Sequence, residues 1–163
     1  MGDKLKNSLI KDCVTVGDKV AVAVSGGIDS MVLLHTFMKE SDALGITFFV
    51  INIEHGIRGD TSRGDSDFVK NYCEKNQIEF IGKSIDVPAM VAESGMTVEE
   101  CARVLRYKVF QQLLDEGKCN KVALAHHLSD QAETVLMRII RGTGLKGLTG
   151  MKKISGNYIR PFL

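Results

Sequence analysis

Short apolar runs alternate along this chain with longer segments of helical periodicity, and this alternation constrains the fold more than any other feature. The runs are rich in β-branched and aromatic residues, which predicts strands at residues 19–24, 46–53, 78–85 and 121–125 and a short one near Tyr158. Apolar spacings of three and four predict helices at residues 3–12, 30–43, 64–76, 97–116 and 130–141. We therefore expect an α/β fold, a Rossmann-like parallel sheet of about five strands with helices on both faces.

The bulk composition favours one soluble domain. With 163 residues and 44% hydrophobic content, the chain can bury one substantial core but is short for two. Its longest apolar runs are far shorter than the roughly 20 residues needed to cross a bilayer, so no membrane partner is expected. The four cysteines are widely separated and no targeting signal opens the chain, which predicts reduced thiols in a cytoplasmic protein.

The charge is unevenly distributed although the net charge is only +1. Residues 134–163 carry six basic side chains and no acidic one, which leaves the rest of the chain acidic. A basic end on an acidic body fits a surface for phosphates or RNA. A solvated face that balances the body's charge fits equally well.

Residues 25–30 form the strongest functional motif, because they turn a predicted strand into a predicted helix. The motif consists of Ser25, Gly26, Gly27, Ile28, Asp29 and Ser30. The glycines let the backbone approach a ligand, and the free amides and dipole at a helix N-terminus favour an anion. We therefore predict that these residues bind the phosphates of ATP.

Asp29 is unusual in such a loop, because a carboxylate beside a triphosphate is repelled unless a divalent cation lies between them. It therefore predicts Mg²⁺. The alternative is an ordinary turn in which Asp29 caps the helix. A Walker A loop is excluded because no lysine stands at the required spacing, and the GxGxxG pattern at residues 142–147 follows a predicted helix instead of a strand.

The loop resembles the SGGxDS motif of the ATP-pyrophosphatase (PP-loop) superfamily. Three further segments narrow the resemblance: NIEHGIR at residues 52–58, EECARVLRY at 99–107 and AHHLSDQAET at 125–134. In this order the motifs are similar to those of the tRNA(Ile)-lysidine synthetases, over nearly the whole chain.

This resemblance implies an adenine nucleotide alpha hydrolase-like fold and a ligase that forms a carbon–nitrogen bond. In that family ATP adenylates the wobble cytidine of tRNA(Ile) with a CAU anticodon, pyrophosphate is released, and L-lysine then displaces AMP to give lysidine. Residues 1–163 would be a single catalytic domain that stops before C-terminal domains for tRNA recognition.

Two arginines are candidate catalytic residues. Arg103 and Arg106 share a helix face with Glu99, away from the apolar stripe. Arginines at such positions suit phosphates or the charge on leaving pyrophosphate. A surface ion pair between Glu99 and Arg103 explains the spacing equally well.

The segment after the fourth predicted strand holds the remaining candidates. We assign a catalytic role to His126, which stands at the ligand-binding edge of the sheet, and a second Mg²⁺ contact to Asp130. Ser129 replaces an acid that the family often carries there, and it could instead cap the following helix. His55 and Arg58 follow the second strand, where they could reach nucleotide or tRNA phosphate.

Two other functions remain open. A related tRNA thiolase would share the fold and the adenylation but usually requires catalytic cysteines or CxxC clusters. The other is a non-catalytic nucleotide-binding module, in which Asp29 would have little function.

Overall fold

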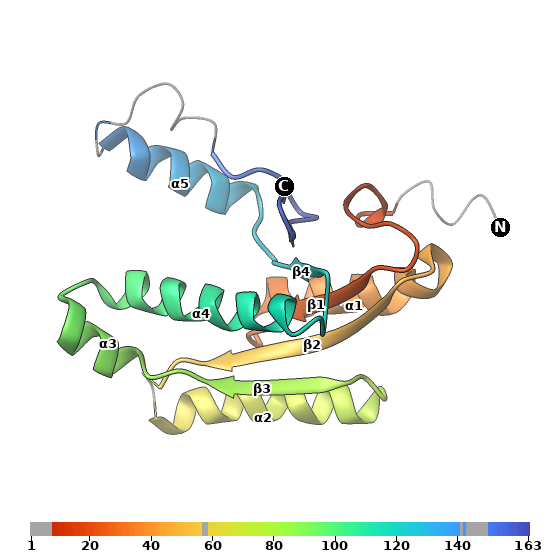
Figure 1. Cartoon of the computed structure of the whole chain (residues 1–163), viewed down its shortest axis with the longest axis horizontal. Helices are drawn as coiled ribbons and strands as arrows, with labels where there is room; N and C mark the ends of the chain where they lie inside the picture. Colours follow the sequence, from red (N-terminus) through yellow and green to blue (C-terminus); the bar gives the residue numbers. More distant parts are fainter. Residues whose placement is uncertain (1–7, 57–58, 141, 143–149) are drawn as a thin grey trace.

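The computed structural model describes residues 8–56, 59–140, 142 and 150–163. Their strands form one six-stranded sheet in the order β3-β2-β1-β4-β6-β5. The strands are β1 Lys19–Ala23, β2 Thr47–Glu54, β3 Phe80–Ser84, β4 Lys121–Ala123, β5 Ile154–Ser155 and β6 Tyr158–Ile159. The α/β fold and the predicted strands are confirmed (Figure 1).

The sheet is parallel except at one edge. Val22 of β1 pairs in register with Val50 of β2 on one side and with Ala123 of β4 on the other. The two-residue β5 instead runs antiparallel to β6. The five predicted strands are parallel, and the added strand β5 was not predicted; it forms where the segment before Tyr158 turns back at Gly156 as a short hairpin.

Four helices lie where the periodicity predicted them, and a fifth was missed. They are α1 Ile28–Leu44, α2 Gly59–Lys75, α3 Val87–Ser94, α4 Val98–Asp115 and α5 Leu128–Ile140. The missed helix is α3, although the side chain of Asp86 caps it by accepting a bond from the Ala89 amide at 2.9 Å. Of the helix predicted at residues 3–12, the first part lies outside the described residues; the described remainder holds only the 3-10 helix Lys11–Cys13.

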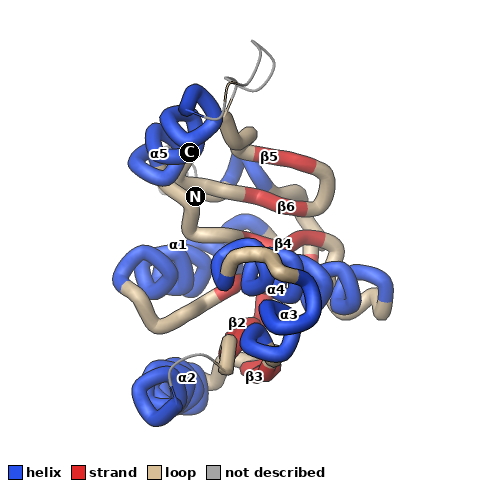
Figure 2. Tube along the Cα trace, turned by 90° about the vertical axis from the view of Figure 1, so that its left-hand side faces the viewer, coloured by secondary structure: helices blue, strands red, loops and turns tan. Residues whose placement is uncertain are grey.

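Helices cover both faces of the sheet, as predicted. Figure 2, which looks along the strands, shows α1 and α2 on one side and α3 and α4 on the other. Phe37 of α1 and Val69 of α2 pack with Val22 in one buried core. Phe110 of α4 packs with Ala21 in a second core on the opposite face. None of the helices, in the part of the chain described, is long and apolar enough to cross a membrane.

The chain reverses its direction of winding between β1 and β4. It leaves β1 for β2 and β3 on one side, then crosses back to place β4 on the other side of β1. The loops after β1 and β4 therefore diverge, and a crevice opens between them at the carboxyl ends of the strands. Open parallel sheets bind their ligands at this position.

Candidate active site

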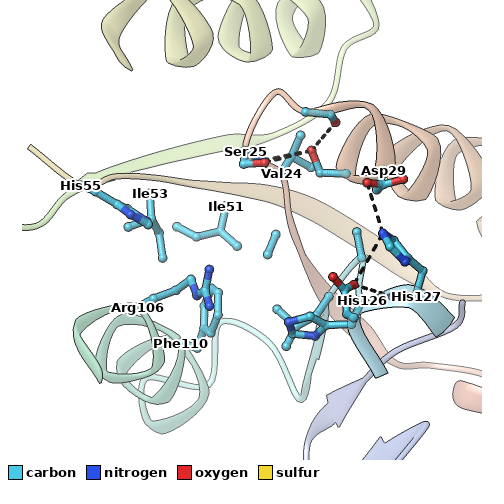
Figure 3. A pocket seen from close by; sticks show the side chains of 16 residues that line it. Val24, Ser25, Asp29, Ile51, Ile53, His55, Arg106, Phe110, His126 and His127 are labelled. Atoms are coloured by element: carbon cyan, nitrogen blue, oxygen red, sulfur yellow. Dashed lines mark hydrogen bonds and ion pairs between the residues drawn. The ribbon is translucent and has the colours of Figure 1, made fainter. Parts of the chain in front are cut away.

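A cavity of about 290 Å³ lies at this crevice (Figure 3). The loops after β1, β2 and β4 contribute to its wall, and α4 closes it from one face. Its polar or charged lining residues are Ser25, Asp29, Ser30, His55, Arg106, His126, His127 and Asp130. The structure thus brings together residues from four of the motifs found in the sequence.

Hydrogen bonds of the Ser30 side chain hold the loop at residues 25–30 in shape. The hydroxyl of Ser30 donates to the Gly27 carbonyl at 2.8 Å and accepts from the Ser25 amide at 3.2 Å. Gly26 has a φ of +93°, and a Cβ there would lie 3.3 Å from the Cβ of Asp65 on α2. Only glycine therefore fits this turn without strain.

The N-terminus of α1 faces the cavity through this loop. Gly27 is its N-cap and no described side chain caps the helix. The first amide groups of a helix have no partner within the helix itself. This arrangement can receive an anion such as a phosphate.

The N-terminus of α5 is capped by His127, not by Ser129 as one interpretation proposed. The Ser129 amide donates to Nδ1 of His127 at 3.2 Å, and the His127 amide donates to Oδ2 of Asp130 at 2.8 Å. The two bonds resemble a capping box, except that an imidazole replaces the hydroxyl and accepts from the second amide of the helix instead of the third. Because Nδ1 accepts a bond, the neutral ring carries its proton on Nε2.

His127 also joins the two aspartates that the sequence predicted as metal ligands. Its Nε2 lies 3.6 Å from Oδ2 of Asp29 and 3.7 Å from Oδ2 of Asp130. Figure 3 shows Asp29 and His127 pointing toward each other across the crevice. The first turns of α1 and α5 thus present two carboxylates to one point.

Arg106 projects from α4 into the cavity. Its Nε is buried and has no hydrogen-bond partner among the described residues. Burial lowers the pKa of Arg106. Burial, followed by the positive charge of Arg106, also lowers the pKa of His55. A half-buried guanidinium with an unused, buried donor suits an anionic ligand.

His126 lines the cavity beside Arg106. Burial, followed by the charges of Arg160 and Arg106, lowers the pKa of His126 to about 4. Its Nδ1 accepts a hydrogen bond of 3.3 Å from Nε of Arg160. His126 is therefore neutral near pH 7.

Comparison with known proteins identifies the family. Residues 3–163 match a family described as a PP-loop domain. The chain belongs to the PP-loop family. We call the turn at residues 25–30, which leads from β1 into α1, the PP loop, after the motif that its sequence resembles.

The relatives of this PP-loop chain include longer proteins. It is 42% identical over 159 residues to the tRNA(Ile)-lysidine synthase of Clostridium acetobutylicum, covering 97% of this chain and 34% of that protein. It is 43% identical over 163 residues to the tRNA(Ile)-lysidine synthase of Clostridioides difficile, covering 99% and 35%. The chain spans about a third of the length of these curated relatives.

A solved structure supports the fold. The U34-tRNA thiolase NcsA from Methanococcus maripaludis, solved with its [4Fe-4S] cluster, superposes with a TM-score of 0.76. It shares 26% sequence identity, and the match covers 98% of this chain and 57% of that chain.

Not every predicted residue of the PP-loop site lines the cavity. Ile28 is 82% exposed and Gly26 backs onto α2, so both shape the PP loop from outside. Arg103 is exposed on α4, with its guanidinium 5.2 Å from the Tyr107 ring centroid. Arg58 lies outside the described residues, as does most of the GxGxxG pattern.

Three residues of the site were not assigned a role from the sequence. His127 stands directly before α5, but the helix was predicted to begin at residue 130, so this position did not mark His127 as a cap. Phe110 lies one turn after Arg106 and lines the same cavity. Arg160 is 34 positions from its partner His126, and no local spacing signals that contact.

Proposed function

We propose that this chain is the adenylating domain of a tRNA(Ile)-lysidine synthase. The observation that carries the proposal is the cavity at the point where the strand order reverses. The PP loop, Asp29 and Asp130 meet there. The curated relatives carry that name, and the ordered motifs resemble those of the same family. ATP, tRNA(Ile) with a CAU anticodon and L-lysine are the proposed substrates.

The PP loop would hold the phosphates of ATP. The open amides at the N-terminus of α1 are the donors for the phosphate oxygens, and the hydroxyl of Ser25, which donates to Oγ of Ser30 at 3.3 Å, would turn to join them. The internal bonds of Ser30 keep this loop in shape before ATP arrives. A preformed loop lowers the entropic cost of binding.

Asp29 and Asp130 fit a magnesium ion that accompanies ATP. Both carboxylates approach the same nitrogen of His127, so both are candidate ligands at this end of the cavity. Mg²⁺ is commonly held by one or two carboxylates together with substrate phosphates. When bound, the ion would neutralise phosphate charge and orient the triphosphate.

Arg106 and His126 would act on the charge that develops as pyrophosphate leaves. The unused Nε of Arg106 gives a charged donor in a buried site, where such a bond is strong. Neutral His126 retains one N–H to donate. In the proposed reaction the C2 oxygen of cytosine attacks the α-phosphorus, the bond to the β-phosphate breaks, and the amine of lysine then displaces AMP.

A thiolase activity is the second candidate, because the superposed NcsA is a tRNA thiolase. The cysteines argue against it. All four are buried and free, and they lie in three separate cores, with Cys13 and Cys73 in one, Cys119 in another and Cys101 in the third. Burial raises the pKa of Cys73 to about 11, so its thiol stays protonated and unreactive.

The test is the incorporation of radiolabelled lysine into transcripts of tRNA(Ile), catalysed by this chain or by a longer protein that contains it. We expect incorporation that requires ATP and a wobble cytidine, with a transcript carrying uridine at that position as the control. Lysine left unincorporated by the longer protein, or sulfur incorporated in its place, would contradict the proposal. If ATP binds but Asp29→Ala alters neither binding nor turnover, a non-catalytic module is favoured.

A further inference from the structure

Arg160 is a buried cation beside the candidate active site. It follows β6 directly and is only 6% exposed. Among the described residues, no carboxylate forms an ion pair with it. Because burying a charge is costly unless its donors are satisfied, its contacts require an explanation.

The guanidinium of Arg160 is held from three directions. Nη1 donates to the Lys152 carbonyl at 3.1 Å, and Nη2 donates to the hydroxyl of Tyr107 on α4 at 3.3 Å. Nε donates to Nδ1 of His126 at 3.3 Å. The first two bonds connect the guanidinium to the loop before β5 and to α4, so they set the direction of the third.

We propose that Arg160 is a positioning residue that holds the imidazole of His126 with its proton on Nε2 and presents that N–H to the substrate. A guanidinium can only donate, so Nδ1 must accept, and the proton of the neutral ring is left on Nε2. Nε2 forms no hydrogen bond with a described residue, while the side chain lines the cavity. This inference rests on the proposed function insofar as it concerns catalysis.

The surrounding charges favour the same state. Arg160 faces His126 from the end of β6, Arg106 and Arg103 from α4, and Asp130 from α5. The three arginines and burial outweigh the single carboxylate, so protonation of His126 is disfavoured. A neutral imidazole held in one tautomer can polarise an oxygen as a hydrogen-bond donor, as in triosephosphate isomerase.

The decisive measurement is the ¹⁵N spectrum of the chain labelled at histidine nitrogens, with His126 assigned by its loss in His126→Gln. We expect one tautomer, protonated at Nε2, between about pH 5 and 8, the range in which an unperturbed histidine titrates. In Arg160→Met the ring should exchange between tautomers, and its titration should move up into that range. Lys152→Met, which removes an exposed neighbouring charge but keeps the accepting carbonyl, should leave the spectrum unchanged.

Tyr107→Phe provides a second variant if Arg160→Met does not fold. It releases Nη2 of Arg160 alone, so a partial loss of the single tautomer is expected. An unchanged His126 spectrum in the folded Arg160 variant, or in Tyr107→Phe if that is the one that folds, would overturn the proposal.

Turnover supplies the readout for catalysis. Arg160→Met should lower kcat by about 10- to 100-fold, as loss of a partner that fixes a ring tautomer does at metal sites. The double variant with His126→Ala should be no slower than His126→Ala alone; additive losses would show that Arg160 acts elsewhere and contradict the inference. If the wild-type enzyme does not modify tRNA, the proposed function fails, yet the spectrum still decides the role of Arg160.

Discussion

Arg106 shows how a single residue can favour binding at the expense of stability. Its Nε is buried and lacks a partner among the described residues, so the folded chain bears an uncompensated cost. We predict that Arg106→Met weakens ATP binding by about 10- to 100-fold, the value of a charge-assisted hydrogen bond, and raises the free energy of unfolding by about 1 kcal/mol. ATP titration and urea denaturation check the two effects.

Lys108→Met is the matched control for Arg106→Met, because Lys108 is exposed on the same helix. It should change neither quantity appreciably. If Arg106→Met instead destabilised the chain and left ATP affinity intact, Arg106 would be a structural residue.

His126 should make the stability depend on pH. Its pKa is lowered to about 4 in the folded chain from an ordinary 6.5, so the unfolded chain binds more protons between those values. The free energy of unfolding therefore falls as pH drops through this window, by roughly 3 kcal/mol at most, and is unaffected by this group above it. Urea denaturation of wild type and His126→Gln from about pH 4 to 7 tests this; parallel curves would refute the prediction.

At the scale of elements, the N-terminus of α5 depends on His127. His127→Ala removes the acceptor for the Ser129 amide and should cost about 1 kcal/mol, as loss of an N-cap does. Ser129→Ala is the control, since the amide of Ser129 and not its hydroxyl makes the capping bond, and the residue is exposed. Equal losses of unfolding free energy in the two variants would show that Ser129 contributes to the cap as much as His127 does.

The turn from β1 into α1 depends on Gly26. An alanine there adopts a strained φ of +93° and also crowds Asp65, so Gly26→Ala should destabilise the chain by about 1 to 2 kcal/mol or more and weaken ATP binding. Gly17→Ala has a similar φ of +88° but meets nothing within 4 Å. It should share the strain without the loss of ATP affinity. If both variants bound ATP normally, the shape of the PP loop would not matter for binding.

The elements that the sequence predicted are those with strong local signals. Runs such as residues 46–53 are β-branched and aromatic, and the helices at α1 and α4 have long apolar stripes. α3 was missed because its eight residues are too few to show a clear period, and β5 was missed because its two residues, Ile154 and Ser155, lie in a glycine-rich segment that was interpreted as turns and loop. The capping role of His127 was missed because imidazoles seldom replace hydroxyls in capping boxes.

At the scale of the whole molecule, alternation predicted the α/β fold but not the strand order. The sequence does not show that the chain crosses back to place β4 beside β1, and this crossing creates the crevice. The PP loop could be found from its own residues because its chemistry is local. The bond from Arg160 to His126 could not, because β6 and the loop after β4 meet only in the folded sheet.

We propose that this site cleaves ATP between its α and β phosphates. The most direct test is product analysis after incubation of α-labelled ATP with tRNA(Ile), L-lysine and the longest protein that contains this chain, with Asp29→Asn as the inactive control. We predict labelled AMP and an equal amount of pyrophosphate, both dependent on the tRNA. Release of labelled ADP with inorganic phosphate, or equal turnover by Asp29→Asn, would contradict the account.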